Sequence, residues 1–279
     1  METRFCDLHT HSVFSDGTCT PEEIVDLAEA AGLSAVALCD HNTLDGLPRF
    51  MAYGKGKRVE TVAGGEFSVS LDGKELHLLG LFIPETAFPR ITQLMESVNK
   101  SKEESNLRMV EALARDGICV DYAAVKAATP TGMINRAHIA AELTRLGYTT
   151  SVKHAFDTVL SLEAGYYKEP MRLSFRDMLD VLVEVGAVPV LAHPLLDLSP
   201  ERLAAFLPLA AEWGLRGMEC YYSTYTPEET QICLELAKAN RLLVSGGSDF
   251  HGGNKPEISL GVGKGDLRIP RACVEGLRP

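Results

Sequence analysis

The chain has 279 residues, of which 46% are hydrophobic, enough for one large α/β domain or for a domain that carries an insertion. Its formal net charge of -11 and its pI near 5.2 argue against a binding surface for duplex nucleic acid, because neutralising phosphates takes clustered Lys and Arg in excess. An anionic substrate must therefore meet positive charge locally.

The sequence gives no sign of membrane insertion or of disulfides. No apolar stretch approaches the roughly 20 residues of a membrane span, and "METRFCDLHT" lacks the apolar centre of a signal peptide. We therefore expect a cytoplasmic protein that does not bind membranes. The seven cysteines form no C-x-x-C pair and stand in apolar runs, so we expect them to be reduced and buried.

Short apolar or β-branched runs alternate with amphipathic stretches, which is typical of βα units with parallel strands. Thr20, Pro21 and Glu23 predict a capped helix start, and Gly32 predicts the end of that helix. "TPEET" at 226–230 repeats the same start. Seven strands are predicted, over residues 4–12, 34–42, 61–69, 75–83, 187–194, 217–223 and 242–251.

A helical stretch interrupts this alternation. Strand signals disappear from about residue 86 to 165, and residues 91–117 and 136–148 have helical periodicity. We therefore predict an α/β domain in two parts, 1–85 and 166–279, with a helical insertion over 86–165 that serves as a lid or substrate domain.

Side chains that bind metals stand at or near the ends of most predicted strands. In "DLHTHSVFSDG", residues 7–17, His9 and His11 are two residues apart and point to one face of an extended segment, and Asp16 follows past a turn. The second strand ends in Asp40-His41. The later strands add Glu66, His77, His193, Asp249 and His251, so that six of the eight histidines lie at or near predicted strand ends.

These residues indicate a catalytic metal centre with more than one ion. Nine candidate ligands exceed the four to six that one ion uses, so we expect two or three divalent ions. Imidazole and carboxylate ligands without thiolate suit Mn²⁺, which we expect first, or Fe²⁺ or Zn²⁺, and suit Mg²⁺ less well. Adjacent ions bridged by a carboxylate activate a water for attack on a phosphoryl group, and Glu66, preceded by two glycines, is the expected bridge.

The order and spacing of these motifs resemble one known family. H-x-H-S followed by S-D-G, then D-H, G-x-E, H-x-L-G, A-H-P and S-D-x-H, are similar to the metal motifs of the polymerase and histidinol phosphatase (PHP) family, from residue 7 to 251 apart from the insertion. The resemblance implies a distorted seven-stranded (β/α) barrel with a trinuclear metal site that hydrolyses phosphoesters.

The resemblance also implies a role for each ligand. His9, His11, Glu66 and Asp249 would hold one ion, and Glu66, His77 and His193 a second, with Asp16, His41 and His251 around the third. Glu66, Asp16 and His193 would be catalytic, with His193 as a proton donor to the leaving oxygen. We expect Asp40 to orient an imidazole by accepting its hydrogen bond. Glu219 either has the same role or is simply satisfied by its neighbours.

Within the family, the chain resembles stand-alone bacterial members that act on nucleoside 3',5'-bisphosphates or trim short 5'-phosphorylated RNA. The expected substrate is thus a small phosphorylated nucleotide, with short single-stranded RNA as a further candidate. Arg136 and His138, at the start of a predicted helix, and Lys168 are expected phosphate contacts, although each is also explained as a surface residue. Tyr166 and Tyr167 either stack on a base or pack at the domain junction.

Three alternatives stay open. A histidinol phosphate phosphatase shares the family and differs in its substrate profile. An amidohydrolase barrel also opens with H-x-H, but the metal-bridging lysine usual in that family is not evident here. A metal-storage or scaffold module has no need for ligands at six strand ends with room for water.

Overall fold

The computed structural model describes residues 5–129 and 134–279, and all seven predicted strands are present in it, although Arg4 of the first one lies outside the described residues. Two further strands of two residues each, β5 and β9, were not predicted, because such short pairings leave no periodic signal. The strands are β1 (Phe5–Thr10), β2 (Ala35–Leu38), β3 (Glu60–Leu71), β4 (Lys74–Leu81), β5 (Leu173–Ser174), β6 (Val188–Leu191), β7 (Gly217–Tyr222), β8 (Leu243–Gly247) and β9 (Ile269–Pro270).

The seven long strands form a nearly closed barrel in the order β8-β7-β6-β4-β3-β2-β1, and β9 pairs with β1. The gap between β1 and β8 is bridged by the backbone, since the His11 N–H donates to Phe250 (2.9 Å) and the Asp249 N–H donates to His9 (2.9 Å). This confirms the predicted distorted seven-stranded (β/α) barrel.

The expectation of parallel strands throughout is wrong for β4, which pairs antiparallel with both β3 and β6. Asp72 and Gly73 join β3 to β4 with positive φ angles of 51° and 77°. Asp-Gly between two alternating runs is a strong signal for a two-residue hairpin turn, so the sequence contained the evidence for this pairing.

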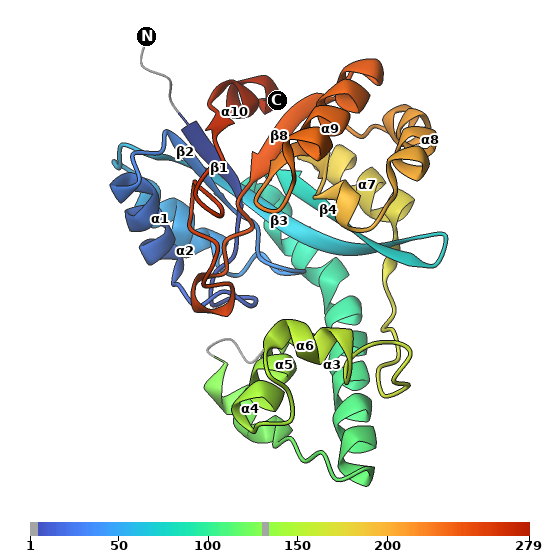
Figure 1. Cartoon of the computed structure of the whole chain (residues 1–279). Helices are drawn as coiled ribbons and strands as arrows, with labels where there is room; N and C mark the ends of the chain where they lie inside the picture. Colours follow the sequence, from blue (N-terminus) through green and yellow to red (C-terminus); the bar gives the residue numbers. More distant parts are fainter. Residues whose placement is uncertain (1–4, 130–133) are drawn as a thin grey trace.

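Helices cover the outside of the barrel (Figure 1). The predicted start of the first one is confirmed: Thr20 and Glu23 form a capping box, and Gly32 follows the helix with a φ of 69°. Thr226 and Glu229 form the same box before α9. These helices are α1 (Pro21–Ala30), α2 (Leu47–Gly54), α7 (Phe175–Glu184), α8 (Pro200–Glu212), α9 (Pro227–Ala239) and α10 (Ala272–Leu277), with 3₁₀ turns η1 (Glu85–Ala87), η2 (Pro194–Leu196) and η3 (Gly252–Asn254).

Between β4 and β5 the described chain is helical: α3 (Phe88–Arg115), α4 (Tyr122–Ala128), α5 (Arg136–Arg145) and α6 (Val152–Asp157). Residues 130–133 of the predicted insertion lie outside the described residues. The first half of α3 packs in the main core through Ile91 and Met95, whereas its second half joins a separate core with α5 through Met109 and Ile139. The helix α3 thus connects the barrel to the other three helices, which lie beyond one end of it (Figure 1).

All seven cysteines are free thiols, as expected. Cys6, Cys39, Cys220, Cys233 and Cys273 are buried, whereas Cys19 is half-buried. The expectation of burial is wrong for Cys119, which is exposed in the segment between α3 and α4. In the part of the chain that the structure describes, no helix is long and apolar enough to cross a membrane.

Candidate metal centre

The nine predicted metal ligands come together at the end of the barrel where β1 ends. His9 is in β1, and His11, Asp16, His41, His193, Asp249 and His251 follow the strands β1, β2, β6 and β8. Glu66 is not at a strand end as expected, because β3 continues past it into a hairpin with β4, the strand that carries His77. A bridge between His41 and Glu66 nevertheless places Glu66 beside the end of β2.

The carboxylate of Glu66 is fully buried at the centre of the group. Its Oε2 atom lies 3.0 Å from His41 Nδ1, 3.3 Å from His9 Nε2 and 3.3 Å from His11 Nε2. Three imidazoles from β1, its following loop and the end of β2 therefore surround one oxygen of this carboxylate.

The other oxygen of Glu66 faces two more imidazoles. Oε1 lies 2.7 Å from His77 Nδ1 and 3.0 Å from His193 Nε2. Because the two oxygens address different sets of histidines, Glu66 has the geometry of a carboxylate shared between neighbouring ion sites.

Asp249 completes one side of the centre. Its Oδ1 atom lies 3.2 Å from His11 Nε2, and the Nε2 atoms of His9 and His11 are 3.0 Å apart. Its Oδ2 atom accepts hydrogen bonds from the Tyr222 hydroxyl (2.7 Å) and the Lys255 ammonium (2.6 Å). Sequence reasoning missed Tyr222 and Lys255, which carry no spacing signal relative to Asp249.

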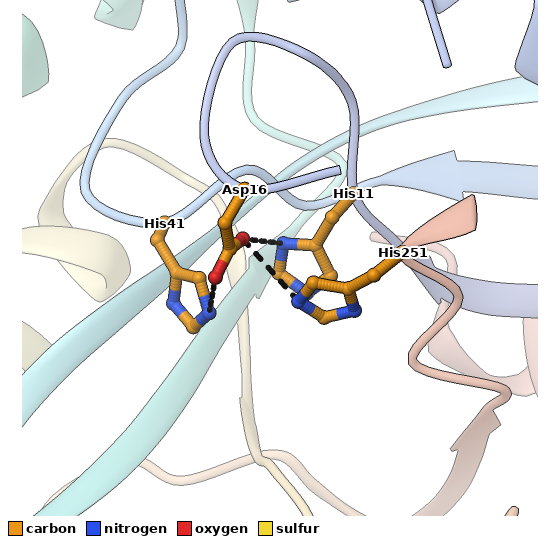
Figure 2. Close-up of side chains that lie close together, drawn as sticks. All are labelled: His11, Asp16, His41 and His251. Atoms are coloured by element: carbon orange, nitrogen blue, oxygen red, sulfur yellow. Dashed lines mark ion pairs between the residues drawn. The ribbon is translucent and has the colours of Figure 1, made fainter. Parts of the chain in front are cut away.

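The carboxylate of Asp16 lies among the imidazoles of His11, His41 and His251 (Figure 2). One carboxylate oxygen lies 3.3 Å from His251 Nε2 and 3.9 Å from His11 Nδ1, and the other lies 3.8 Å from His41 Nε2. The loop after β1, the end of β2 and the segment after β8 thus present ligands to one point.

Among the described residues there are four groups of side chains in which the ligand atoms of the group all lie within 4.8 Å of one another. They regroup some of the predicted sets: His193 lies with His9 and Glu66, and His77 with His41 and Glu66. The groups are His9, His11 and Asp249; His9, Glu66 and His193; His41, Glu66 and His77; and His11, Asp16, His41 and His251.

The donors fit divalent metal ions. Within the described residues, four buried atoms of the centre have no hydrogen-bond partner, namely Asp16 Oδ1, Glu66 Oε2, His77 Nδ1 and His193 Nδ1. Buried polar atoms are nearly always paired, so an orphaned set at one point indicates that something else satisfies them. Nitrogen and oxygen donors without sulfur are those of Mn²⁺, Fe²⁺ or Zn²⁺ sites.

The pKa shifts of these side chains also favour bound cations. Burial raises the pKa of Glu66, but the imidazoles of His41, His77 and His9 outweigh burial and hold that pKa well below its usual range. Burial lowers the pKa of His77, but Glu66 and Glu75 raise it to about 10. The carboxylate of Glu66 therefore remains anionic and is stabilised by positive charge beside it. Bound cations can supply that charge, as imidazolium groups can.

Surrounding carboxylates hold the ligands in place. Glu219, in β7, is fully buried and contacts His9 Nδ1 (3.1 Å) while accepting from the His193 backbone N–H (2.8 Å). This contact selects the tautomer of His9 that leaves Nε2 free toward Glu66.

The expected role of Asp40 is wrong. Its carboxylate accepts from the Ser12 N–H (2.8 Å), the Ser12 hydroxyl (2.7 Å) and the Ser15 hydroxyl (2.7 Å), and no imidazole of the described residues donates to it. Asp40 instead fixes the loop that carries Asp16, because serine donors stand opposite the end of β2.

Backbone strain also concentrates here. His193 and Asp249 have φ angles of 24° and 56°, and Asn42, next to His41, has 53°. Non-glycine residues in this region cost of order 1–3 kcal/mol each and cluster at functional sites.

A pocket of about 190 Å³ lies between the barrel and the helical segment, next to the centre. Arg136 enters it from the start of α5, with its guanidinium carbon 4.0 Å from the centre of the Tyr167 ring. Lys102 of α3 and Arg172 also line it. Tyr167 is thus a buried support for Arg136.

The other predicted substrate contacts are placed differently. The imidazole of His138 accepts the Asn135 backbone N–H at Nδ1 (3.0 Å) and so caps α5. The Lys168 side chain is exposed and outside the pocket lining, and its carbonyl accepts from Ser105. The Tyr166 hydroxyl donates to Asp116 (2.5 Å). Sequence reasoning missed Lys102, which reads as a surface position of a long polar helix.

Comparison with known proteins gives concordant results. The sequence profile of the PHP domain matches residues 7–168. A 5'-3' exoribonuclease of Haemophilus influenzae is 30% identical over 250 residues, covering 89% of this chain and 90% of the relative. A phosphoribosyl 1,2-cyclic phosphate 1,2-diphosphodiesterase of Eggerthella lenta is 31% identical over 265 residues, covering 92% and 98%.

A 3',5'-nucleoside bisphosphate phosphatase of Chromobacterium violaceum is 29% identical over 248 residues, covering 88% of this chain and 86% of the relative. A crystal structure from Bifidobacterium adolescentis, described as a metal-dependent phosphoesterase, superposes with a TM-score of 0.84 at 29% identity, covering 98% of this chain and 95% of that one.

Proposed function

Because this chain belongs to the PHP domain family and is therefore a metal-dependent phosphoesterase, we propose that its substrates are small phosphorylated nucleotides. The reaction is hydrolysis of a phosphate monoester, with a nucleoside 3',5'-bisphosphate converted to a 5'-monophosphate and phosphate. The observation that carries the proposal is the pocket with Arg136, Lys102 and Arg172, which opens beside the metal ligands.

The proposed metal ligands are the nine side chains around Glu66, Asp16 and Asp249, holding two or three divalent ions, with Mn²⁺ expected first. Bound ions of this kind polarise a phosphoryl oxygen, activate water and neutralise the leaving oxygen. Glu66 holds the ligand sets together through its two oxygens, and Asp16 fixes the set drawn in Figure 2. Nε2 of His193 lies 3.0 Å from Glu66 Oε1, whereas its Nδ1 has no hydrogen-bond partner among the described residues. Nδ1 is therefore the atom that would hold a proton near the leaving oxygen.

Arg136 is the proposed contact to the phosphate that is not cleaved. Its side chain is 29% exposed and stands at the N-terminus of α5, where backbone N–H groups and the helix dipole also favour an anion. Glu75 Oε2 lies 3.6 Å from Arg136 and 2.6 Å from Arg172, so a substrate phosphate competes with this carboxylate for the two guanidinium groups. His138 supports the same helix start, and Lys168 stays a candidate contact at the surface.

Short 5'-phosphorylated RNA is a second candidate substrate. A neighbouring pocket of about 400 Å³ shares Asn42 and Lys102 with the first and continues along α3 past Asn99 and Lys100. A chain longer than a mononucleotide therefore has a polar path beyond the first pocket.

The deciding experiment measures product release by Mn²⁺-loaded protein from a substrate panel. The panel holds 3',5'-bisphosphates, mononucleotides, a ribosyl cyclic phosphate, short 5'-phosphorylated oligoribonucleotides, histidinol phosphate and an acylated amine. Highest kcat/KM on a bisphosphate or an oligoribonucleotide supports the proposal. Preference for histidinol phosphate or for the cyclic phosphate refutes the nucleotide assignment, and deacylation without phosphate release would support an amidohydrolase.

A further inference from the structure

Lys255 lies at the metal centre although no motif predicts a cation there. Its ammonium donates to Asp249 Oδ2 at 2.6 Å, whereas Asp249 Oδ1 faces His11 Nε2 at 3.2 Å. The Tyr222 hydroxyl already donates to Oδ2 at 2.7 Å. The carboxylate therefore has a hydrogen-bond donor without Lys255, and satisfying Asp249 does not by itself explain a lysine at this position.

The side chain of Lys255 also lines a pocket directly over the ligands. This pocket has a volume of about 220 Å³ and is lined by Glu66, His77, His193 and Tyr222 as well. An ammonium carries three N–H donors. Among the described residues Asp249 is the acceptor it contacts, so donors remain for a group that enters the pocket.

The backbone holds Lys255 in a fixed position relative to the metal ligands. Lys255 follows η3 directly, and its backbone N–H donates to the carbonyl of Gly252 (3.1 Å), the first residue of η3. The turn is fastened to the loop that carries Asp16, since the Gly253 N–H donates to Thr18 Oγ1 (2.7 Å) and the Asn254 amide donates to the Asp16 carbonyl (2.8 Å). The lysine is thus presented by a segment tied to the centre and not by a free loop.

We propose that Lys255 is a further catalytic residue, whose ammonium donates a charge-assisted hydrogen bond to a non-bridging oxygen of the phosphoryl group being cleaved. The inference rests on the proposed function, because it requires a phosphoryl group in the pocket lined by Glu66 and His193. Catalysis of phosphoryl transfer consists largely of positioning and of neutralising charge on these oxygens, and a compact ammonium suits that role.

The experiment uses Mn²⁺-loaded protein and inorganic phosphate as the probe, with Lys255→Met and Lys255→Gln as variants. We expect phosphate, followed by calorimetry, to bind about ten- to a hundredfold more weakly to both variants. The Mn²⁺ content measured by elemental analysis should stay unchanged. Turnover of p-nitrophenyl phosphate should fall by a similar factor, with partial recovery in Lys255→Arg.

The Gln variant keeps a donor toward Asp249 without the charge, so it carries the comparison if the Met variant does not fold. Lys264→Met is the matched control, because Lys264 is an exposed lysine further along the same C-terminal segment. Unchanged phosphate binding by both variants overturns the proposal. So does a loss of Mn²⁺ whose effect on phosphate binding disappears at saturating Mn²⁺, since Lys255 then only positions Asp249. Failure of the proposed function is distinct, because the unmodified protein would then prefer histidinol phosphate, the cyclic phosphate or the acylated amine over the nucleotides of the panel.

Discussion

Replacing Arg136 by alanine tests the nucleotide assignment most directly. Loss of one charge-assisted phosphate contact costs about 1.5–3 kcal/mol, or about ten- to a hundredfold in kcat/KM. With 29% of the side chain exposed, solvent screens part of the contact, so we expect the lower half of that range. Glu75 keeps its ion pair with Arg172 at 2.6 Å, so the variant should fold.

The assay compares kcat/KM on a nucleoside 3',5'-bisphosphate with kcat/KM on p-nitrophenyl phosphate, which has no second phosphate. Arg136→Ala should lower only the first. Arg145→Ala is the control, because Arg145 lies at the other end of α5, is 69% exposed and pairs with Glu142. Equal losses on both substrates would place Arg136 on the cleaved phosphoryl group. No loss on either would make it a surface arginine and would refute the reasoning.

Three more predictions concern the metal centre. Elemental analysis should find at least two divalent ions per chain, and one ion or none after reconstitution would refute a polynuclear centre. Chelation should lower the melting temperature, because a ligand that binds only the folded state stabilises it. Glu66→Gln and Asp16→Asn should each abolish phosphate release while the circular dichroism spectrum stays unchanged. The control is Asp180→Asn, because Asp180 is 51% exposed on α7 and pairs with Arg176; loss of activity in this control as well would point to a nonspecific effect. Mn²⁺ affinity, measured by competition titration, should rise with pH between about 6 and 9. Metal binds only the neutral imidazole, and the pKa of His77 is raised to about 10, so protons compete with the metal over this whole range. An affinity that does not change with pH would contradict this.

The sequence predicted which side chains lie together best where the candidate ligands follow the ends of barrel strands. Strand ends at one end of a barrel must meet, so His9, His41, His193 and Asp249 were predictable as neighbours from the alternation of strands and helices alone. Glu66 and His77 joined them for a different reason, since they sit within a long hairpin whose Asp72-Gly73 turn is itself a local signal.

The residues that the sequence did not reveal reach the site through contacts between segments that lie far apart in the sequence. Lys102 enters the pocket because α3 crosses from the barrel to the other helices, and Lys255 reaches Asp249 because η3 is tied to the loop after β1. Asp40 was assigned to an imidazole, but two serines of a different loop compete for its oxygens. Neither periodicity nor spacing encodes such contacts, because they depend on how loops pack after the barrel has closed.

The charge distribution explains how a chain with a net charge of -11 can attract an anion. Charges on the surface are screened over about 8–10 Å at physiological ionic strength, so the pocket responds mainly to what lies inside it. Glu66, Asp16 and Asp249 would repel a phosphate, but bound divalent ions would offset them. The pocket beside the centre is also lined by Lys102, Arg136, Arg172 and Glu75. Arg172 forms an ion pair with Glu75, so the charges of Lys102 and Arg136 are left for a substrate. The pocket therefore has an excess of positive charge from Lys102, Arg136 and Arg172, and bound ions would extend it to the carboxylates of the neighbouring centre.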